Sequence, residues 1–288
     1  MKKCDLSDLP RCVDIAFRRN NTPESSCAFC PRSKAAIESD FRALLPDPDC
    51  LLAGCFDGGT RIGVLGCFMN PENGWVDLIG PFLDGDWDGA RAIKLVRFAM
   101  DTLPKAKQFN FYFDARNENA HRLAEVLNAE RKDNEYIMVL SRADYVPQRT
   151  GRTVVSYTAQ YGTELAGLHD KTFPDIYVSG AEILSTVGET REAFCALDED
   201  GAFAGYGVLA LEGGGRALCA EIFAVKEEFR GQGFGWALLN AVCAAAFRDH
   251  RGDTVILVVD KLNAGARALY ESCGFRLKTE NEACRVRV

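Results

Sequence analysis

A glycine-rich turn between an apolar strand and an apolar helix carries the clearest chemical signal in the chain. The strand is predicted over 220–225, the turn reads Arg230-Gly-Gln-Gly-Phe-Gly235, and the helix follows directly. Glycines let the backbone curve so that successive N–H groups point the same way, and the helix dipole adds positive potential there. Such a turn suits an anionic ligand, most often a phosphate.

Three phosphate-binding patterns can be compared with this turn. Gly231, Gly233 and Gly235 form Gly-x-Gly-x-Gly, whereas dinucleotide-binding folds need Gly-x-Gly-x-x-Gly. The residues after Gly235 lack the Lys and the Ser or Thr of a nucleotide P-loop. The third pattern, Arg-x-x-Gly-x-Gly, is met by Arg230, Gly233 and Gly235. It resembles the acetyl-CoA pyrophosphate loop of the GNAT superfamily of N-acetyltransferases.

A second segment, residues 258–275, adds to this resemblance. Asn263 is a good helix N-cap, Tyr270 lies seven residues later on the same helix face, and Gly274 suits a helix C-cap before Phe275. The order resembles the GNAT segment in which an Asn opens a helix, a Tyr follows two turns later and Gly-Phe closes it. The resemblance covers roughly residues 150–288, and it implies a mixed sheet that splays at the strand ending in Val225.

The resemblance also implies a role for each site residue. The backbone of 222–225 would pair with the pantetheine arm, the turn would hold the pyrophosphate by its N–H groups, and no metal is implied. Tyr270 would point at the thioester sulfur, and Glu221 would be the general base through water, with Asp260 a lesser candidate. The implied cofactor-binding residues are Phe223, Ala224, Val225, Arg230, Gly231, Gln232, Gly233, Phe234, Gly235, Trp236, Asn263 and Tyr270.

The implied reaction is direct attack of an amine on the acetyl thioester of acetyl-CoA. An alkyl amine has a pKa near ~10, so it arrives protonated and needs a base or a proton path. Proton transfer from a tyrosine at ~10 to a thiolate near ~8.5 is uphill by about 2 kcal/mol, so hydrogen bonding to the forming thiolate is an equal alternative. The acceptor is expected to be a small amine or a peptide. The alternative function is a non-catalytic acyl-CoA-binding or sensing protein.

The chain also repeats itself at one constant spacing. Asp260 and Asp114 differ by 260 − 114 = 146, and Asn263 and Asn117 by 263 − 117 = 146. The same shift relates further pairs in the helix and in the distant glycine turn: Ala266 to Ala120, Leu269 to Leu123, Glu271 to Glu125, Gly231 to Gly85 and Gly235 to Gly89. We infer an internal duplication into domains 1–146 and 147–288, each an α/β (α+β) mixed, splayed, mostly antiparallel sheet flanked by helices.

The two halves differ at the turn. The shift places Arg230–Gly235 on Asp84-Gly-Asp-Trp-Asp-Gly89, so Trp87 stands at the position of Gly233. An indole blocks close approach of a phosphate, and each aspartate within ~4 Å of one would cost on the order of 4 kcal/mol at an effective dielectric near 20. The helix dipole returns at most about 1 kcal/mol. We therefore expect the cofactor in the second half and a degenerate first half.

Hydrophobic periodicity and turn residues place the remaining elements. Residues 141–152, which are polar and contain Pro147, are the expected linker. Helices are predicted from 7 or 8 to 19, at 33–45, 90–103 and 117–129, within 163–187, at 235–247 and at 264–272. Strands are predicted at 51–56, 62–69, 75–79, 109–113, 136–140, 194–197, 203–211, 220–225, 255–259 and within 284–288.

Composition limits the class of protein. The chain has 288 residues, 47% hydrophobic and 26% charged, with a net charge of −7 and a pI near 5.2. This argues against nucleic acid or an anionic membrane as the main partner. No apolar run reaches ~18 residues and no secretory signal is evident, so we expect a cytoplasmic protein. Oligomeric state is left open by the sequence.

Cysteines and histidines give weak signals. Most of the 12 cysteines stand in apolar surroundings and are expected to be reduced. Cys27 and Cys30 are at metal-ligand spacing, but a zinc site would need Cys4 or Cys12 as well, and a loop with two thiols is the simpler interpretation. His121, His169 and His250 share no metal-like spacing and are expected on helix surfaces.

Overall fold

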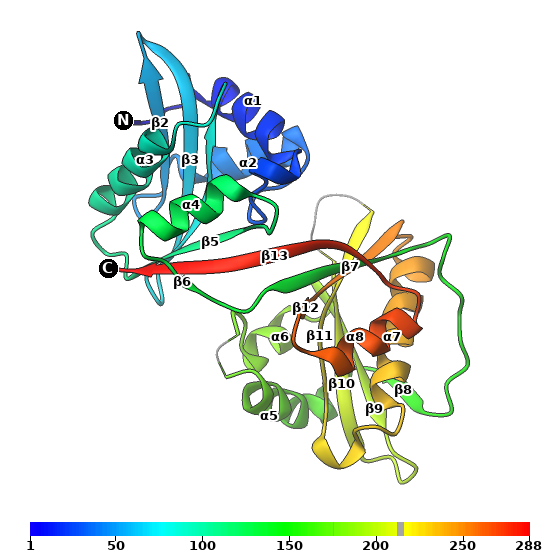
Figure 1. The fold of residues 1–288 in the computed structure, drawn as a ribbon. Coiled ribbons are helices and arrows are strands. Elements are labelled where there is room, and N and C mark those ends of the chain that lie inside the picture. Colours follow the sequence, from blue (N-terminus) through cyan, green and yellow to red (C-terminus); the bar gives the residue numbers. More distant parts are fainter. Residues whose placement is uncertain (175, 212–215) are drawn as a thin grey trace. The chain divides into compact units, whose positions relative to one another are not determined.

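The computed structural model describes residues 1–174, 176–211 and 216–288, and its contacts divide the chain into two compact units (Figure 1). The first comprises Met1–Glu135 and Thr279–Val288, and the second comprises Tyr136–Lys278. Each contains a mixed, mostly antiparallel sheet flanked by helices, so the predicted fold class is confirmed. Asp175, inside the helical span predicted within 163–187, lies outside the described residues.

The first unit is built on the strand order β1-β2-β3-β4-β5-β13, with β6 also paired to β13. Its pairs are antiparallel except for the parallel pair β4–β5. Its elements are β1 (Lys2–Lys3), α1 (Leu9–Asn20), η1 (Pro23–Ser25), α2 (Lys34–Leu44), β2 (Leu51–Asp57), β3 (Thr60–Asn70), β4 (Trp75–Leu83), α3 (Gly89–Thr102), β5 (Gln108–Asp114), α4 (Glu118–Val126), β6 (Glu130–Arg131) and the last part of β13 (Arg276–Arg287).

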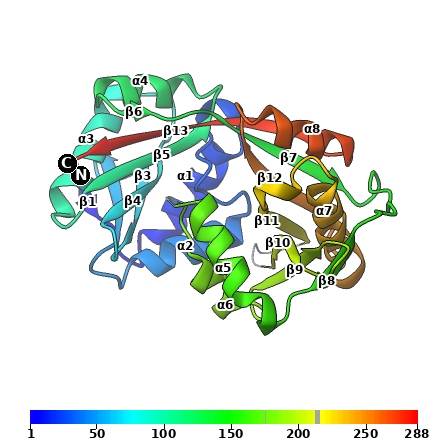
Figure 2. The same cartoon turned by 90° about the horizontal axis from the view of Figure 1, so that it is seen from below.

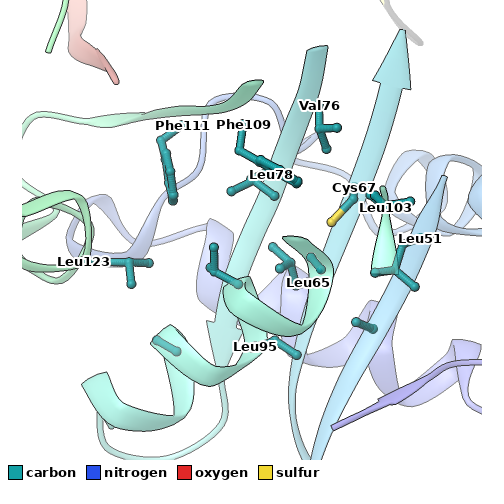
Figure 3. Packing of buried hydrophobic residues seen from close by; sticks show 14 of the residues in the cluster. Leu51, Leu65, Cys67, Val76, Leu78, Leu95, Leu103, Phe109, Phe111 and Leu123 are labelled. Carbon is teal, nitrogen blue, oxygen red and sulfur yellow. The ribbon is translucent and has the colours of Figure 1, made fainter. Parts of the chain in front are cut away.

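The core of the first unit lies on both faces of its sheet. On one face Leu95 of α3 and Leu123 of α4 pack with Leu65, Leu78 and Phe109 of the strands (Figure 3). A second cluster on the other face combines side chains of α1 and α2 with β2, β3 and β4. Fully burying each such side chain contributes about 1.5–3 kcal/mol relative to exposure. The sheet is therefore fixed from both sides, which holds the strand ends and the turns after them.

The second unit has the strand order β7-β12-β11-β10-β9-β8 (Figure 2). The pair β11–β12 is parallel, while β8–β9, β9–β10 and β10–β11 are antiparallel. Its elements are β7 (Glu135–Ser141), β8 (Thr153–Ser156), η2 (Ala159–Tyr161), α5 (Gly162–Thr172), α6 (Gly180–Thr186), β9 (Arg191–Leu197), β10 (Phe203–Ala210), β11 (Ala217–Val225), η3 (Glu227–Phe229), α7 (Phe234–Ala244), the π-helix η4 (Ala245–Asp249), β12 (Thr254–Asp260) and α8 (Ala264–Ser272).

Helix caps recur at the predicted spacing. Asn117 accepts from the N–H of Ala120 and Asn263 from that of Ala266, both at 3.0 Å. Ser33 and Ser179, which also differ by 179 − 33 = 146, each accept from the N–H three residues later at 3.2 Å. Each such cap contributes about 1 kcal/mol. The repetition of local chemistry supports the inferred duplication.

The spacing changes at the strand that precedes the glycine turn. Trp75 of β4 pairs with Gln108, and Ala217 of β11 pairs with Thr254. These strands therefore correspond at 217 − 75 = 142, whereas β5 and β12 keep 254 − 108 = 146. The extra residues of the second half lie between β11 and the turn, where η3 forms. Glu221 consequently corresponds to Ile79, and Phe223 to Pro81.

The last strand of each half belongs to the other unit. Residues 136–141 of β7 lie in the second unit, and 279–288, with most of β13, lie in the first. The two strands are equivalent, since 281 − 135 = 146. The structure thus divides the chain at residue 135 and returns its end to the first unit, which differs from the expected division at 146. The expected strand within 284–288 was too short, because charged residues such as Glu282 are buried in ion pairs that apolar periodicity does not register.

We predict that a chain ending at Lys278 loses the order of β5. Residues 281–287 pair with 108–114, so their removal leaves Phe109 and Phe111 on an open edge. Hydrogen exchange of the β5 amides should accelerate about tenfold or more, while those of β9 and β10 stay protected. A control chain ending at Val286 keeps most of the pairing and should behave as the full chain. Unchanged β5 protection after the longer truncation would contradict this.

Candidate functional site

The glycine turn presents an unusual run of free backbone donors. Gly231 has φ +74° and Gly233, the N-cap of α7, has φ +87°, conformations that favour glycine. No side chain caps α7. Among the described residues, the N–H groups from Gly231 to Trp236 have no hydrogen-bond partner in the protein. An acceptor from outside is therefore required to satisfy them, or water must do so.

The turn is held from below by packing. Phe234 is 1% exposed and its ring lies 5.4 Å from that of Phe229, edge to face. The Arg152 guanidinium lies 4.6 Å from the Phe234 ring centroid, and its Nε donates to the Gln232 carbonyl at 2.9 Å. The Arg230 side chain donates to the Val225 carbonyl at 3.2 Å while remaining exposed. These contacts hold the Phe234 ring and the Gln232 carbonyl in place without using the N–H groups of the turn.

The strand before the turn has one unpaired edge. β11 pairs with β12 only from Ala217 to Cys219, and after that point the two strands diverge. On its other side β11 pairs with β10, with a register shift that leaves Glu221 without an opposite residue, which is a β-bulge. Just beyond this pairing, the backbone N–H of Lys226 donates to the Ala204 carbonyl at 2.9 Å. Because hydrogen-bonded residues alternate in an antiparallel pair, the backbone groups of Phe223 and Val225 face the divergence, whereas those of Ala224 face β10.

Glu221 is held in an ion pair. Arg191 on β9 donates to both carboxylate oxygens, at 2.7 and 2.8 Å, and the Tyr177 hydroxyl donates to Oε1 at 2.6 Å. The Glu221 side chain is 8% exposed. Glu221 lies at the bulge of β11, but its carboxylate is directed to Arg191 of β9, and three strong donors already use its oxygens. Sequence reasoning could not find Arg191, which lies 30 residues away.

Tyr270 and Asn263 lie on α8 as the sequence predicts. Tyr270 is partly buried, with its ring 6.1 Å from that of Phe275, and burial raises its pKa to about 12. The phenol is therefore neutral at pH 7 and can donate a hydrogen bond. The carbonyl oxygen of Asn263 caps the helix, so only its amide N–H groups are left for a ligand. Asp260 accepts from the N–H of Leu262 at 2.7 Å and shapes the turn before α8.

A buried polar chain under β10 was missed. His169 is completely buried, so its expected place on a helix surface was wrong. Its Nε2 lies 2.8 Å from the Val178 carbonyl and its Nδ1 lies 2.6 Å from the Tyr206 hydroxyl. The carbonyl can only accept, so Nε2 carries the hydrogen of that contact. The signal was present: His169 follows buried Leu165 by one helical turn.

In the first unit the equivalent turn is filled by its own side chains. Asp88 caps α3 by accepting from the Arg91 N–H at 3.0 Å. Asp84 pairs with Arg11 and with Arg18, the latter at 2.9 Å, and the guanidinium of Arg18 lowers the pKa of Asp84. The acceptor that α7 lacks is thus supplied internally to α3.

The strand divergence of the first unit is also occupied. Ala28 donates to the Tyr112 carbonyl at 2.6 Å, and Cys27 forms an antiparallel bridge with Phe113 of β5. Pro81, at the position of Phe223, has no N–H to offer. A pocket of about 190 Å³ remains beside this segment, with Trp87 in its wall.

The described residues contain no group of three or more His, Cys, Asp or Glu placed to hold a metal ion. Cys27 and Cys30 are both buried, and burial raises the pKa of Cys27 to about 11. A neutral thiol is a poor zinc ligand, because the metal binds the thiolate. Within 1–174, 176–211 and 216–288, no helix combines the length and apolar character needed to span a bilayer.

Comparison with known proteins identifies the family and the fold. Residues 156–275 match the model of the acetyltransferase (GNAT) family. No match was found among curated protein sequences. A GCN5-related N-acetyltransferase from Sphaerobacter thermophilus superposes with a TM-score of 0.77 at 16% identity, over 100% of this chain and 95% of that one.

Two further solved structures are similar over nearly the whole chain. A tandem GNAT protein from the clavulanic acid biosynthesis pathway has a TM-score of 0.68 at 17% identity, covering 98% of this chain and 95% of its own. A glucosamine N-acetyltransferase region in a fungal multi-domain β-N-acetylglucosaminidase has a TM-score of 0.70 at 12% identity, covering 99% of this chain and 37% of that one.

Residues 156–275 therefore belong to the GNAT family, and the chain as a whole has the fold of tandem GNAT proteins. The matched residues are those of an acetyltransferase domain. The predicted family, tandem arrangement and enzyme class are confirmed.

The ion pair at Glu221 gives a stability prediction. Arg191→Met leaves a nearly buried carboxylate without its cation, which should lower the free energy of unfolding by about 3 kcal/mol. Replacing Glu221 by Leu as well should recover part of this loss. Arg216→Met is the control, because Arg216 and Asp253 are 65% and 56% exposed and their pair should contribute less than about 1 kcal/mol. Urea unfolding measures all three; equal losses for the two arginine variants would contradict the assignment.

Proposed function

We propose that the protein is an acetyl-CoA-dependent N-acetyltransferase that transfers the acetyl group to a primary amine of a small molecule or peptide by direct attack. The observation that carries this proposal is the run of unpartnered N–H groups from Gly231 to Trp236 beside the free edge of β11. One tandem neighbour is described as a form without acetyl-CoA, which is consistent with the same ligand. The cofactor half would be 147–288, and 1–146 would be a degenerate copy.

The cofactor would extend along these free donors. The backbone groups of Phe223 and the N–H of Val225 would pair with the amides of the pantetheine arm as a further strand would, because the Val225 carbonyl already accepts from Arg230. The turn would receive the pyrophosphate, where each charge-assisted hydrogen bond contributes roughly 1.5–3 kcal/mol. Three or four such bonds suffice for useful affinity without a metal. The amide of Asn263 would donate to the arm, and exposed Arg230 would add positive charge at the mouth of the turn.

At the reacting end, the neutral phenol of Tyr270 would donate a hydrogen bond to the leaving thiolate. With a pKa near 12 it is a weaker acid than an ordinary tyrosine, so complete proton transfer to a thiolate near ~8.5 is uphill by more than 4 kcal/mol. Stabilisation of the thiolate is therefore the better role for Tyr270. Glu221 would accept the proton of the amine through the Tyr177 hydroxyl or a water, with Arg191 keeping the carboxylate in place.

The second candidate is a non-catalytic acyl-CoA-binding protein. The observation that favours it is the Glu221–Arg191 pair, because three donors already use the carboxylate oxygens that would have to take up the proton of the amine. The two functions separate in one assay. The protein is mixed with acetyl-CoA and a panel of polyamines, aminoglycosides, amino acids and peptides, and free thiol is followed. Tight CoA binding without thiol release on any acceptor would support the binding protein.

Tyr270→Phe tests the catalytic role. Loss of the hydroxyl removes the donor to the thiolate while leaving the ring in place. We expect kcat to fall about 10- to 1,000-fold with little change in the dissociation constant of CoA. Steady-state thiol release and calorimetric titration with CoA measure the two quantities. Tyr136→Phe is the control, because it removes a hydroxyl from a tyrosine that has no proposed role in the reaction, and it should leave kcat unchanged. An unchanged kcat in Tyr270→Phe would remove Tyr270 from the mechanism.

Gly233→Trp tests the pyrophosphate site. The substitution copies the residue of the first half, places an indole over the donors and strains a backbone at φ +87°. We expect CoA affinity to fall at least about 100-fold, since two charge-assisted hydrogen bonds are worth that much. The matched control is Trp87→Gly, the reverse change in the other half, which should leave affinity unaltered. If Trp87→Gly weakens CoA binding and Gly233→Trp does not, the two halves have been assigned the wrong way round.

A further inference from the structure

Two cysteines and a buried arginine meet near the start of the first unit. The Sγ atoms of Cys4, just after β1, and Cys12, in α1, lie 3.8 Å apart. Nη1 of Arg61, on β3, lies 2.6 Å from the Cys4 sulfur and 3.1 Å from the Cys12 sulfur. Cys4 is anchored by its N–H to the Leu52 carbonyl at 2.8 Å. Three segments far apart in sequence thus converge on one pair of sulfurs.

The guanidinium of Arg61 is built into this position. The residue is 5% exposed, forms an ion pair with Asp8, and lies 4.5 Å from the ring centroid of Phe56. Gly54 makes the room for it, because a Cβ there would stand 2.6 Å from Nη1 of Arg61 and 3.1 Å from the Cys4 sulfur. A buried cation needs acceptors on every side. Here one side is a carboxylate and the other is the two sulfurs.

The pKa values of the two thiols are shifted in opposite directions. The hydrogen bond from Cys12 and the positive charge of Arg61 lower the pKa of Cys4, against the opposing effects of burial and Asp8. The hydrogen bond to Cys4 and burial raise the pKa of Cys12. A thiolate formed at Cys4 would accept from the Cys12 thiol and from the Arg61 guanidinium. Arginine suits this role because it stays charged when buried.

Comparison with the other cysteines sets Cys4 apart. All twelve are free, and three are partly exposed: Cys4, Cys219 and Cys273. Burial raises the pKa of Cys219 to about 11 and also raises that of Cys273. Cys4 alone among these three combines access from solvent, a neighbouring cation and a second thiol within reach. Thiolate character and exposure together determine which cysteine reacts with an oxidant.

We propose that Cys4 is a site of two-electron oxidation by hydroperoxides and that Cys12 resolves it as an intramolecular disulfide. The Cys4 thiolate attacks one peroxide oxygen, the O–O bond breaks, and an alkoxide or hydroxide leaves and takes up a proton, which gives a sulfenic acid. The Cys12 sulfur then attacks the Cys4 sulfur, the S–O bond breaks, and the thiol proton leaves with hydroxide as water. The two thiols lose two electrons and two protons, and the peroxide is reduced to an alcohol or water.

The geometry asks for only a small adjustment. The sulfurs must close from 3.8 Å to a bond of about 2.05 Å. Cys12 lies in a packed helix, whereas Cys4 follows a two-residue strand, so Cys4 is the side that moves. The reaction lies outside the acetyl-transfer chemistry proposed above and does not depend on it.

The first test is the order of alkylation in the full-length protein. Limiting iodoacetamide at pH 7, followed by peptide mass mapping, should label Cys4 at least about tenfold faster than Cys219 and Cys273. Arg61→Gln should slow Cys4 about tenfold, while Arg97→Gln, a change on the exposed face of α3, should not. Labelling of the buried Cys243 reports unfolding of a variant. If Cys4 in the wild type is no faster than Cys219 and Cys273, the proposal is wrong, whatever the Arg61 variant does.

The second test follows the oxidation itself. One equivalent of hydrogen peroxide should join the tryptic peptides that contain Cys4 and Cys12, and dithiothreitol should separate them. In Cys12→Ser the sulfenic acid should persist at Cys4 and be trapped by dimedone. Peroxide that consumes other thiols first, or a Cys12→Ser variant that dimedone does not label at Cys4, would overturn the assignment.

Discussion

The glycine turn of the second half has six successive backbone N–H groups, Gly231 to Trp236, without an acceptor in the protein. This constraint determines how the rest of the second half must hold the turn. Unsatisfied donors are costly in a packed interior, so the turn from Gly231 to Trp236 must lie at the surface, and only packing beneath it can define its shape. Phe234 and Arg152 supply that packing. Gly231 and Gly233 adopt positive φ angles, which glycine tolerates and other residues rarely adopt. A turn can bind an anion through its backbone alone only if packing holds it rigid while its N–H groups make no hydrogen bonds within the protein.

The first half shows what the same fold does when this condition is dropped. Asp88 satisfies the start of α3, Asp84 pairs with arginines of α1, and the chain near Cys27 bridges the exposed edge of β5. Each change exchanges an external ligand for an internal one, so the unit gains contacts that need no cofactor. The sheet order and the helix caps are retained, because they hold the fold and are indifferent to what the turn binds.

The parts that sequence predicted well are those determined within one turn of chain. The helix of Asn263 and the glycine turn follow from caps, periodicity and glycine spacing, which are local. Glu221 was correctly placed on its strand, but its partner Arg191 lies on a strand two positions away in the sheet, and no pattern in the sequence relates them. The return of β13 to the first unit is equally non-local. The position of β13 depends on which open sheet edge it pairs with, and β13 pairs with β5. Because β5 and β12 are equivalent strands, the local sequence of β13 does not distinguish between them.

The ion pair at Glu221 does not by itself separate an enzyme from a binding protein. Releasing a proton from an amine of pKa ~10 at pH 7 costs about 4 kcal/mol, and a turnover of ~10 per second allows a total barrier of about 16 kcal/mol. The reaction therefore requires a path for the amine proton more than it requires a strong base. A Glu221 oxygen that already accepts hydrogen bonds can still relay this proton to water. Developing negative charge on sulfur is the harder demand, because the cation of the same helix, Arg267, is directed to the Lys261 carbonyl and to Glu271. The neutral phenol of Tyr270 then carries most of the catalytic demand: it can donate a hydrogen bond to the sulfur, whereas its raised pKa makes it a poor acid.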